Sequence, residues 1–205
     1  MFHLSTVEEE TFKLLKSVFE IPFVYDQFAL AGGTSIALQT GHRKSIDLDF
    51  FSEQQFIPTD LENLLAGNRM WNYEPIGTNQ RMLFCNINHI KCDFVNEPFP
   101  IIKPFDLVDG IKLYSLQDIA AMKLHAICGR GKKKDFFDIY VLLKLFSWKE
   151  MLEWFELKYG QSQLFFLWKS ISYFDDAESD VDIRGMKPYT ATWDDIKSLI
   201  QQTCR

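Results

Sequence analysis

The feature that most constrains the fold is the segment Ile46–Phe51, in which apolar and acidic residues alternate. A period of two predicts a β-strand, and residues i and i+2 of a strand project from the same face. Asp47 and Asp49 are therefore expected side by side in mostly apolar surroundings, where two carboxylates repel each other and lose hydration. Magnesium relieves both costs, because it takes oxygen ligands and accepts one or two carboxylates together with phosphate oxygens. The alternative is an edge strand whose aspartates point into water.

A double glycine upstream favours the metal-site interpretation. Gly32, Gly33 and Thr34 lie between an apolar strand near Phe28 and a helix predicted over Ser35–Gln39. Glycines allow a phosphate to approach backbone N–H groups, and the start of a helix favours an anion. Thr34 adds a hydroxyl donor. The turn is not a Walker A loop, because no Gly-Lys-Ser/Thr follows it. With the two aspartates, it predicts one wall for a triphosphate and another for its metal ions.

A third carboxylate, Asp93, interrupts the strand-like run Ile90–Val95. From a neighbouring strand it would reach the same metal ions. Three carboxylates that hold two cations about 3.5–4 Å apart can activate an acceptor hydroxyl and stabilise a leaving pyrophosphate. Taken alone, Asp93 is equally consistent with an acid on an edge strand or in a hairpin.

The order of the predicted elements indicates the fold class. The first helix is expected to begin at a capping box of Ser5 or Thr6 with Glu8 or Glu9 and to end at Pro22. Further elements are predicted as a helix over Asp60–Gly67, a strand over Met82–Asn88, and helices from Ser115, around Phe136, over Trp148–Leu157 and over Trp193–Gln201. We expect an α/β (α+β) fold, with a small mixed sheet in an α/β core over residues 1–105 and a helical lobe over residues 106–205.

Composition limits the class of protein. The net charge is −6 and the isoelectric point is about 5.2, so any surface that binds nucleic acid is expected to be local. The four cysteines show no CxxC spacing, which argues against a zinc site or a disulfide framework. The sequence shows neither a signal peptide nor an apolar run of about 20 residues. A cytoplasmic protein without a membrane partner is expected.

A basic block follows the predicted sheet. Lys123, Arg130 and Lys132–Lys134 place five positive charges within twelve residues. They form either a solvated basic face or a phosphate clamp, in which Arg130 offers a bidentate fork and Lys123 a point charge. Asp135 and Asp138 are neighbours on one helix face, where they anchor the basic residues or one of them takes a proton from the acceptor. Lys132 and Lys133, in the loop between two helices, are expected to contact the backbone of an RNA acceptor.

Two blocks of the sequence resemble a known family. Leu30–Leu38, followed by Gly41–Phe51, resembles the signature of the AbiEii/AbiGii toxin family of nucleotidyltransferases, within the DNA polymerase β-like superfamily. In the second block Asp118 stands five residues before Lys123, and the run from Arg130 to Asp138 has the pattern R-x-x-x-K-D-x-x-D. The two blocks together are specific to this family.

The resemblance covers roughly residues 28–145 and departs from the family pattern in two places. Pro98 stands five residues after Asp93, where the family often has lysine. Leu116 stands where the family often has serine, and Asp118 replaces a glutamate. These departures concern the choice of nucleotide more than the reaction.

The resemblance implies transfer of a nucleoside monophosphate from an NTP to an acceptor hydroxyl, with release of pyrophosphate. In that reaction Asp47 and Asp49 would hold two Mg²⁺ ions, and Asp93 would share one of them and favour the attacking oxygen. The residues expected to act in catalysis are Asp47, Asp49, Asp93, Lys123, Asp135 and Asp138. Those expected to bind the nucleotide are Gly32, Gly33, Thr34, Arg43, Lys123, Arg130 and Lys134. His42 is also expected to lie near a phosphate.

The resemblance also implies partners. Family members act as toxins paired with antitoxins, and some modify the acceptor ends of tRNA, so the expected partners are an NTP, an RNA acceptor and a cognate antitoxin. Two alternatives stay open. One is a nucleotide-binding or antitoxin-binding module without turnover, and the other is transfer to a small molecule or a protein side chain.

Overall fold

Strand β2 (Leu48–Ser52) arises from the alternating segment and lies at the centre of the sheet. In residues 2–204, which the computed structural model describes, this sheet has seven strands in the order β3-β4-β5-β2-β1-β7-β6. β2 is parallel to β5 and antiparallel to β1, β1 is parallel to β7, and the other neighbours are antiparallel. The remaining strands are β1 (Ala29–Leu30), β3 (Tyr73–Thr78), β4 (Met82–Ile87), β5 (Ile90–Asn96), β6 (Asp106–Val108) and β7 (Ile111–Leu113).

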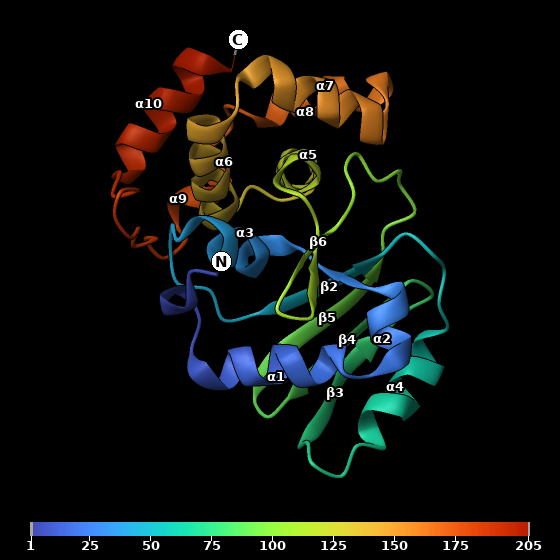
Figure 1. Ribbon diagram of the computed structural model, residues 1–205. Helices are drawn as coiled ribbons and strands as arrows, with labels where there is room; N and C mark the ends of the chain where they lie inside the picture. The colour runs from blue at the N-terminus through green and yellow to red at the C-terminus, as the bar shows by residue number, and fades with distance from the viewer. Residues whose placement is uncertain (1, 205) are drawn as a thin grey trace.

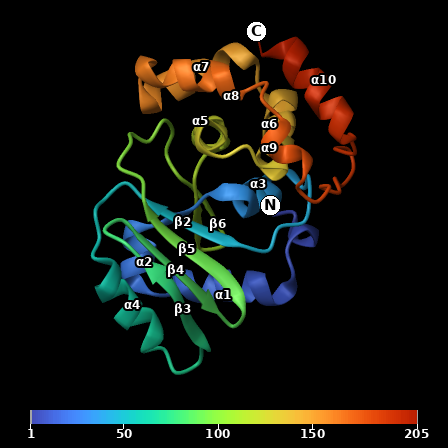
Figure 2. The same ribbon diagram turned by 180° about the vertical axis from the view of Figure 1, so that it is seen from behind.

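One face of the sheet is apolar. Leu48 and Phe50 of β2 and Phe94 of β5 are fully buried on it, and the rings of Phe50 and Phe94 stack with their centroids 4.7 Å apart. Helices from the first third of the chain cover this face, as Figures 1 and 2 show. They are α1 (Glu9–Phe19), α2 (Pro22–Gln27) and α4 (Pro58–Ala66). Because Leu48 and Phe50 point into this core, Asp49 points from the opposite face.

The opposite face carries α3 and the C-terminal helices, which gather above the sheet in Figure 1. The helices of this layer are α3 (Gly32–Thr40), α5 (Leu116–Gly129), α6 (Lys133–Leu145), α7 (Trp148–Tyr159), α8 (Leu164–Ser170), α9 (Asp175–Glu178) and α10 (Trp193–Thr203). Short 3₁₀ helices span Leu4–Thr6 and Gln161–Gln163. The expectation of a mixed sheet followed by a helical C-terminal region is confirmed.

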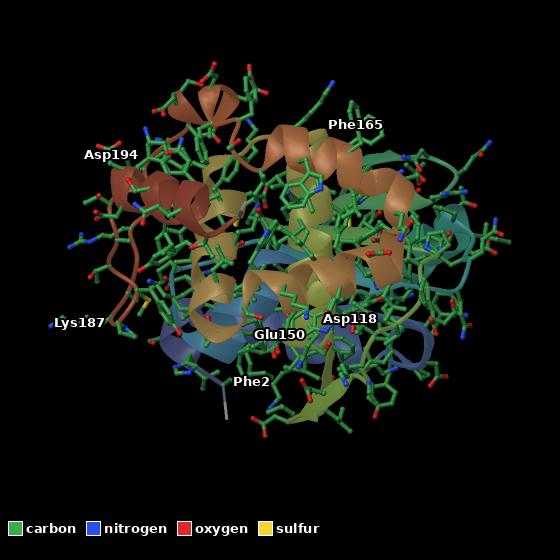
Figure 3. The ribbon with its side chains drawn as sticks, turned by 90° about the horizontal axis from the view of Figure 1, so that it is seen from above. Phe2, Asp118, Glu150, Phe165, Lys187 and Asp194 are labelled. Carbon is green, nitrogen blue, oxygen red and sulfur yellow. The ribbon has the colours of Figure 1, made fainter. Side chains whose placement is uncertain are left out.

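A buried ion pair inside the C-terminal layer also fixes the loop that leaves the sheet after β5. Asp118 of α5, labelled in Figure 3, accepts a hydrogen bond from Lys158 Nζ of α7 at 3.1 Å, and neither side chain is exposed. The carboxylate also accepts the backbone N–H groups of Ile102 and Lys103, at 2.9 and 3.0 Å. Asp118 therefore holds the loop that leaves β5 against the helices. Ser115 caps α5 as expected, because its hydroxyl accepts the N–H of Asp118 at 3.1 Å.

Some local expectations were wrong. The predicted capping box at Ser5 and Thr6 does not form, because the Thr6 hydroxyl donates to the His3 carbonyl at 2.7 Å and α1 begins at Glu9. Pro22 opens α2 instead of merely ending the first helix, since the first turn of a helix needs no N–H from proline. The sheet also continues past residue 105 through β6 and β7, so the helical region starts at Leu116. A division of the chain into two domains stays a prediction.

None of the helices in residues 2–204 combines the length and the apolar composition that a bilayer crossing requires.

Candidate active site

The three predicted carboxylates lie on one wall of a single cavity. Asp49 of β2 and Asp93 of β5 are partners in the parallel register, and Asp47 directly precedes β2 on the same face as Asp49. All three line a cavity of about 370 Å³ between the sheet and α5. Phe51, Ile119 and Met122 form an apolar part of its lining.

The double glycine leaves room for the side chains of the site. Gly32 has a φ of +65°, and a Cβ added to it would lie 2.1 Å from Asp49 Oδ2. A Cβ on Gly33 would lie 2.3 Å from Arg43 Nη2. Both glycines line the cavity, and α3 begins at Gly32. A side chain at either position would push Asp49 or Arg43 out of place.

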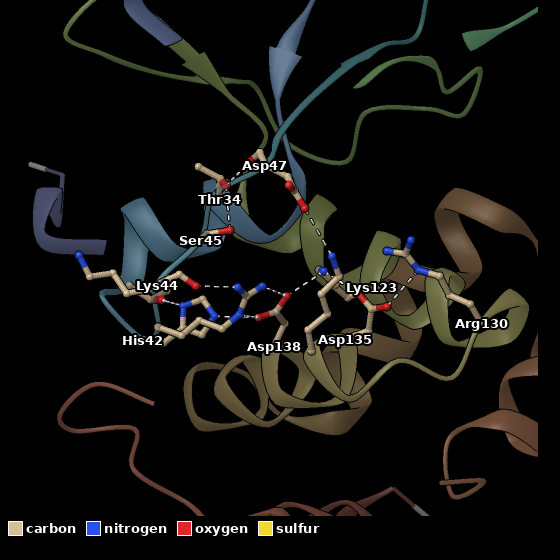
Figure 4. A network of polar contacts seen from close by, with 12 residues as sticks. Thr34, His42, Lys44, Ser45, Asp47, Lys123, Arg130, Asp135 and Asp138 are labelled. Atoms are coloured by element: carbon tan, nitrogen blue, oxygen red, sulfur yellow. Dashed lines mark hydrogen bonds and ion pairs between the residues drawn. The ribbon is translucent and has the colours of Figure 1, made fainter. Parts of the chain in front are cut away.

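Thr34 differs from what the sequence suggested. Its side chain is fully buried, its hydroxyl donates to the carbonyl of Asp47, and Oγ1 lies 2.8 Å from Ser45 Oγ. The hydroxyl therefore has its partners in the loop before β2, as Figure 4 shows. This geometry assigns Thr34 to positioning Asp47 rather than to contacting a phosphate.

Two lysines face the carboxylates. Lys91 Nζ pairs with Asp93 Oδ2, and Lys134 Nζ lies 3.7 Å from Asp47 Oδ2. Burial would lower the pKa of Lys91, but the hydrogen bond and charge of Asp93 outweigh it and raise the pKa. Lys91 was missed by sequence reasoning, although its spacing of two from Asp93 matches that of Asp47 from Asp49.

The carboxylates have the chemistry of a magnesium site but are not gathered around one point. Asp93 Oδ1 is buried without a hydrogen-bond partner, which marks an acceptor that a cation would satisfy. Burial raises the pKa of Asp49, and the charges of Asp93 and Asp47 add to the effect, so a nearby cation would favour its ionised form. Within residues 2–204, however, no set of three or more His, Cys, Asp or Glu side chains is arranged to hold a metal ion.

The opposite wall of the cavity is built on Lys123 of α5. Its Nζ lies 2.8 Å from Asp135 Oδ1 and 2.7 Å from Asp138 Oδ2, both in the first turns of α6 (Figure 4). Burial would lower the pKa of Lys123, but the two carboxylates outweigh it and raise the pKa, so the ammonium stays charged. It lines the cavity with only a small exposed fraction.

Asp138 is the centre of this network. The guanidinium of Arg43 donates to both of its oxygens, with Nε at 2.8 Å and Nη2 at 3.0 Å, and His42 Nε2 lies 2.7 Å from Oδ1. Burial would raise the pKa of Asp138, but Arg43 and Lys123 hold it well below its usual range. A carboxylate that is fully buried and so strongly held in its ionised form is a poor proton acceptor. The anchor role that the sequence left open for Asp138 is therefore the one that the geometry supports.

The remaining members of the basic block differ in their surroundings, and Lys132 stays half-exposed with its Nζ 3.3 Å from Asp180 Oδ1. Arg130 Nε donates to the buried Asp135 at 3.1 Å, while its side chain stays 56% exposed and lines the cavity together with Lys134. Lys133 is buried, and its ammonium donates to the Asp180 carbonyl and to Asp182, both at 2.9 Å. The expected contact of Lys133 with an RNA backbone is therefore wrong, because the ammonium is already paired inside the protein.

The segment 180–189, here called the C-terminal strap, holds the loop that carries Arg43. The N–H of Met186 donates to the His42 carbonyl at 2.7 Å, and Gly185 forms a β-bridge with Arg43. A Cβ on Gly185 would lie 1.8 Å from the carbonyl oxygen of Tyr189, so only glycine fits there. His42 is fully buried beneath the strap, where burial lowers its pKa despite the charge of Asp138. The expected contact of His42 with a phosphate is therefore wrong, because the ring is fully buried and its Nε2 is already paired with Asp138.

Comparisons with known proteins show what the chain is similar to. The chain is 31% identical over 189 residues to the uncharacterized protein aq_aa25 of Aquifex aeolicus, covering 87% of each chain. Its fold is similar to that of a candidate nucleotidyltransferase from Helicobacter pylori, with a TM-score of 0.52, 17% identity, and 96% and 95% of the two chains covered. It is also similar to MenT4, a nucleotidyltransferase toxin from Mycobacterium tuberculosis, with a TM-score of 0.51, 14% identity, and 72% and 65% covered. At these identities the two structures show a shared fold.

A family model assigns the chain more directly. The model described as "Nucleotidyl transferase AbiEii toxin, Type IV TA system" matches residues 13–77 and 85–200, which include Asp47, Asp49, Asp93 and the basic block. The chain therefore belongs to the AbiEii family of nucleotidyltransferase toxins of type IV toxin–antitoxin systems.

Proposed function

We propose that this enzyme transfers a nucleoside monophosphate from an NTP to a hydroxyl group of an RNA acceptor. The observation that carries the proposal is the pairing of Asp49 with Asp93 on adjacent strands, across one cavity from Lys123 and Arg130. Such a cavity offers oxygen ligands for metal ions on one wall and positive charge for a triphosphate on the other.

The metal-binding residues in this proposal are Asp47, Asp49 and Asp93. Mg²⁺ bound there would neutralise charge on the phosphate oxygens and make the acceptor hydroxyl more acidic. The acceptor oxygen forms a bond to the α-phosphorus while the bond between the α- and β-phosphates breaks. Pyrophosphate leaves, and the hydroxyl proton passes to the carboxylate of Asp93.

In this proposal the triphosphate lies between the start of α3 and the basic wall of the cavity, which is formed by Arg43, Lys123, Arg130 and Lys134. The N-terminus of α3 at Gly32 and Gly33 presents backbone N–H groups and the positive end of a helix dipole. Lys123 and Arg130 supply charge from the other side, and Lys134 and Arg43 complete the set of cations that line the cavity. Thr34, Asp135 and Asp138 act as positioning residues, since each has its polar atoms bonded within the protein.

The proposals of an RNA acceptor and of an antitoxin partner rest on the family and not on the geometry of the cavity. Since the family consists of toxins of toxin–antitoxin systems, we propose that a cognate antitoxin exists for this chain. The RNA acceptor rests on the family resemblance, and the net charge of −6 confines any RNA-binding surface to a local patch.

The test is transfer of label from each of the four NTPs, labelled at the α-phosphate, to total RNA in the presence of Mg²⁺. Label is expected to enter RNA from one or more NTPs, with stoichiometric release of pyrophosphate. Asp49→Asn keeps the size of the side chain but removes a charge from the proposed metal site, so it should abolish transfer and toxicity while the protein stays folded. Toxicity that persists in Asp49→Asn would favour a binding module without turnover. Label that enters protein or a small molecule instead would replace the RNA acceptor.

A further inference from the structure

Lys91 pairs with the third carboxylate of the proposed metal site. It lies two residues before Asp93 on the same face of β5, and both side chains line the cavity. In the parallel register of β2 and β5, Cys92 is the partner of Leu48 and Asp93 is the partner of Asp49. One residue earlier in each strand direction, Lys91 lies level with Asp47. Lys91 therefore pairs with Asp93 and lines the same cavity as Asp47 and Asp49.

The two members of the Lys91–Asp93 pair differ in their freedom to move. The Asp93 side chain is 14% exposed, whereas that of Lys91 is 44% exposed and ends in a flexible four-carbon chain. Lys91 can rotate its ammonium away from Asp93 without disturbing the strand, whose backbone is held by pairing with β4. Asp93 has less room to turn away. Any exchange of partners at this carboxylate is therefore made by the lysine.

The pair leaves Asp93 incompletely satisfied. Lys91 contacts Oδ2, while Oδ1 is buried and lacks a hydrogen-bond partner. A buried acceptor without a partner is costly, and one monovalent ammonium satisfies only half of this carboxylate. The contact of Lys134 with Asp47 is looser, at 3.7 Å, so Lys91 is the stronger of the two competing cations.

We infer that Lys91 is a placeholder cation, which neutralises Asp93 in the nucleotide-free enzyme and moves to the phosphates of the NTP when a divalent metal ion takes Asp93. The inference rests on the proposed function, because it requires Asp93 to be a metal ligand. It makes Lys91 a positioning residue that delays tight metal binding until a nucleotide is present. The ammonium leaves one anion for another, so its own charge stays paired throughout the exchange.

The test compares Mn²⁺ binding, followed by the loss of the electron paramagnetic resonance signal of free Mn²⁺, in wild type and in Lys91→Met. Without nucleotide, Lys91→Met should bind Mn²⁺ up to about fivefold more tightly, the ratio equivalent to a partly exposed ion pair of about 1 kcal/mol. With Mn²⁺ held saturating, the same variant should bind ATP more weakly, because a phosphate contact is lost. Opposite changes in the two affinities would not follow from a purely structural role. Lys91→Arg, which keeps the charge, should stay close to wild type in both.

Two further variants control the test. Lys149→Met removes an exposed, ion-paired lysine of α7 outside the cavity and should change neither affinity. Asp93→Asn should weaken Mn²⁺ binding, and adding Lys91→Met to it should then bring no gain, because the lysine acts through Asp93. Unchanged or weaker Mn²⁺ binding in Lys91→Met, alongside weakened binding in Asp93→Asn, would overturn the inference and leave the proposed function standing. Mn²⁺ binding unaffected by both Asp49→Asn and Asp93→Asn would refute the metal site itself.

Discussion

Replacing Asp138 by asparagine tests whether the buried network is the support of the basic wall. The substitution keeps the shape of the side chain and removes the charge that faces Arg43, Lys123 and His42. Arg43 loses its bidentate partner, and Lys123 is left with Asp135 alone. Removing one partner from a buried ion pair costs about 3–5 kcal/mol, because the other charge stays buried without compensation. Since a domain is stable by only about 5–15 kcal/mol, Asp138→Asn should be among the most damaging single changes.

The assay is urea unfolding of wild type and Asp138→Asn at pH 7, with Asp182→Asn as the control. Asp182 also pairs with a lysine, Lys133, at 2.9 Å, but its side chain is 87% exposed. The control should therefore lose no more than about 1 kcal/mol. If Asp138→Asn also lowers the free energy of unfolding by less than about 1 kcal/mol, the reasoning is refuted, because the buried network would then not stabilise the fold.

The pH dependence gives an independent check. The pKa of Asp138 is well below its usual range in the folded protein, whereas in the unfolded chain it is about 3.9. A depressed pKa stabilises the folded state fully above the unfolded value, and this contribution disappears as the pH falls through the folded value. The difference in stability between wild type and Asp138→Asn should therefore be constant from about pH 8 to about pH 5 and shrink below about pH 4. A difference that shrinks near neutral pH would contradict the assignment.

The same variant separates an anchor from a catalytic base. If Asp138 positions Arg43 and Lys123, the folded fraction of Asp138→Asn should bind ATP more weakly, because both cations of the wall lose their orientation. A base would behave differently, since its loss would lower the turnover rate and leave ATP affinity intact. Isothermal titration with ATP below the unfolding transition distinguishes the two roles.

Two glycines offer further tests of the site. Gly32→Ala places a methyl group 2.1 Å from Asp49 Oδ2 at a φ of +65°. It should cost about 1–2 kcal/mol of stability through backbone strain, measured by calorimetry, and abolish transfer in the labelled-NTP assay. Full activity would show that Asp49 is free to move. Gly185→Ala should displace the C-terminal strap and weaken ATP binding through Arg43, whereas Gly77→Ala, where a Cβ meets nothing within 4 Å, should not; equal ATP affinities in the two variants would rule out support of Arg43 by the strap.

Much of the fold follows from local patterns. The alternation around Asp47 and Asp49 predicted the central strand, the double glycine predicted the turn into a helix, and Ser115 predicted the start of α5. These signals are readable because each depends on the periodicity or chemistry of a few consecutive residues. Strands β3, β6 and β7 were missed, because β3 is an exposed edge strand with Pro75 and Gly77 and the other two have three residues each.

Spacing along the chain predicts which residues bear the chemistry, because the family pattern includes the aspartates, the glycines and the basic block. What each of these side chains faces follows only from the folded structure. Lys133 and Asp138 have partners that are distant in the chain, so their burial and their roles follow from tertiary contacts. Lys91 reaches Asp93 because packing selects the face of β5 from which both side chains project. Burial and ion pairing are properties of the three-dimensional structure, and spacing along a chain does not specify them. The strap at Gly185, which contacts Arg43 across more than a hundred residues, is the plainest case.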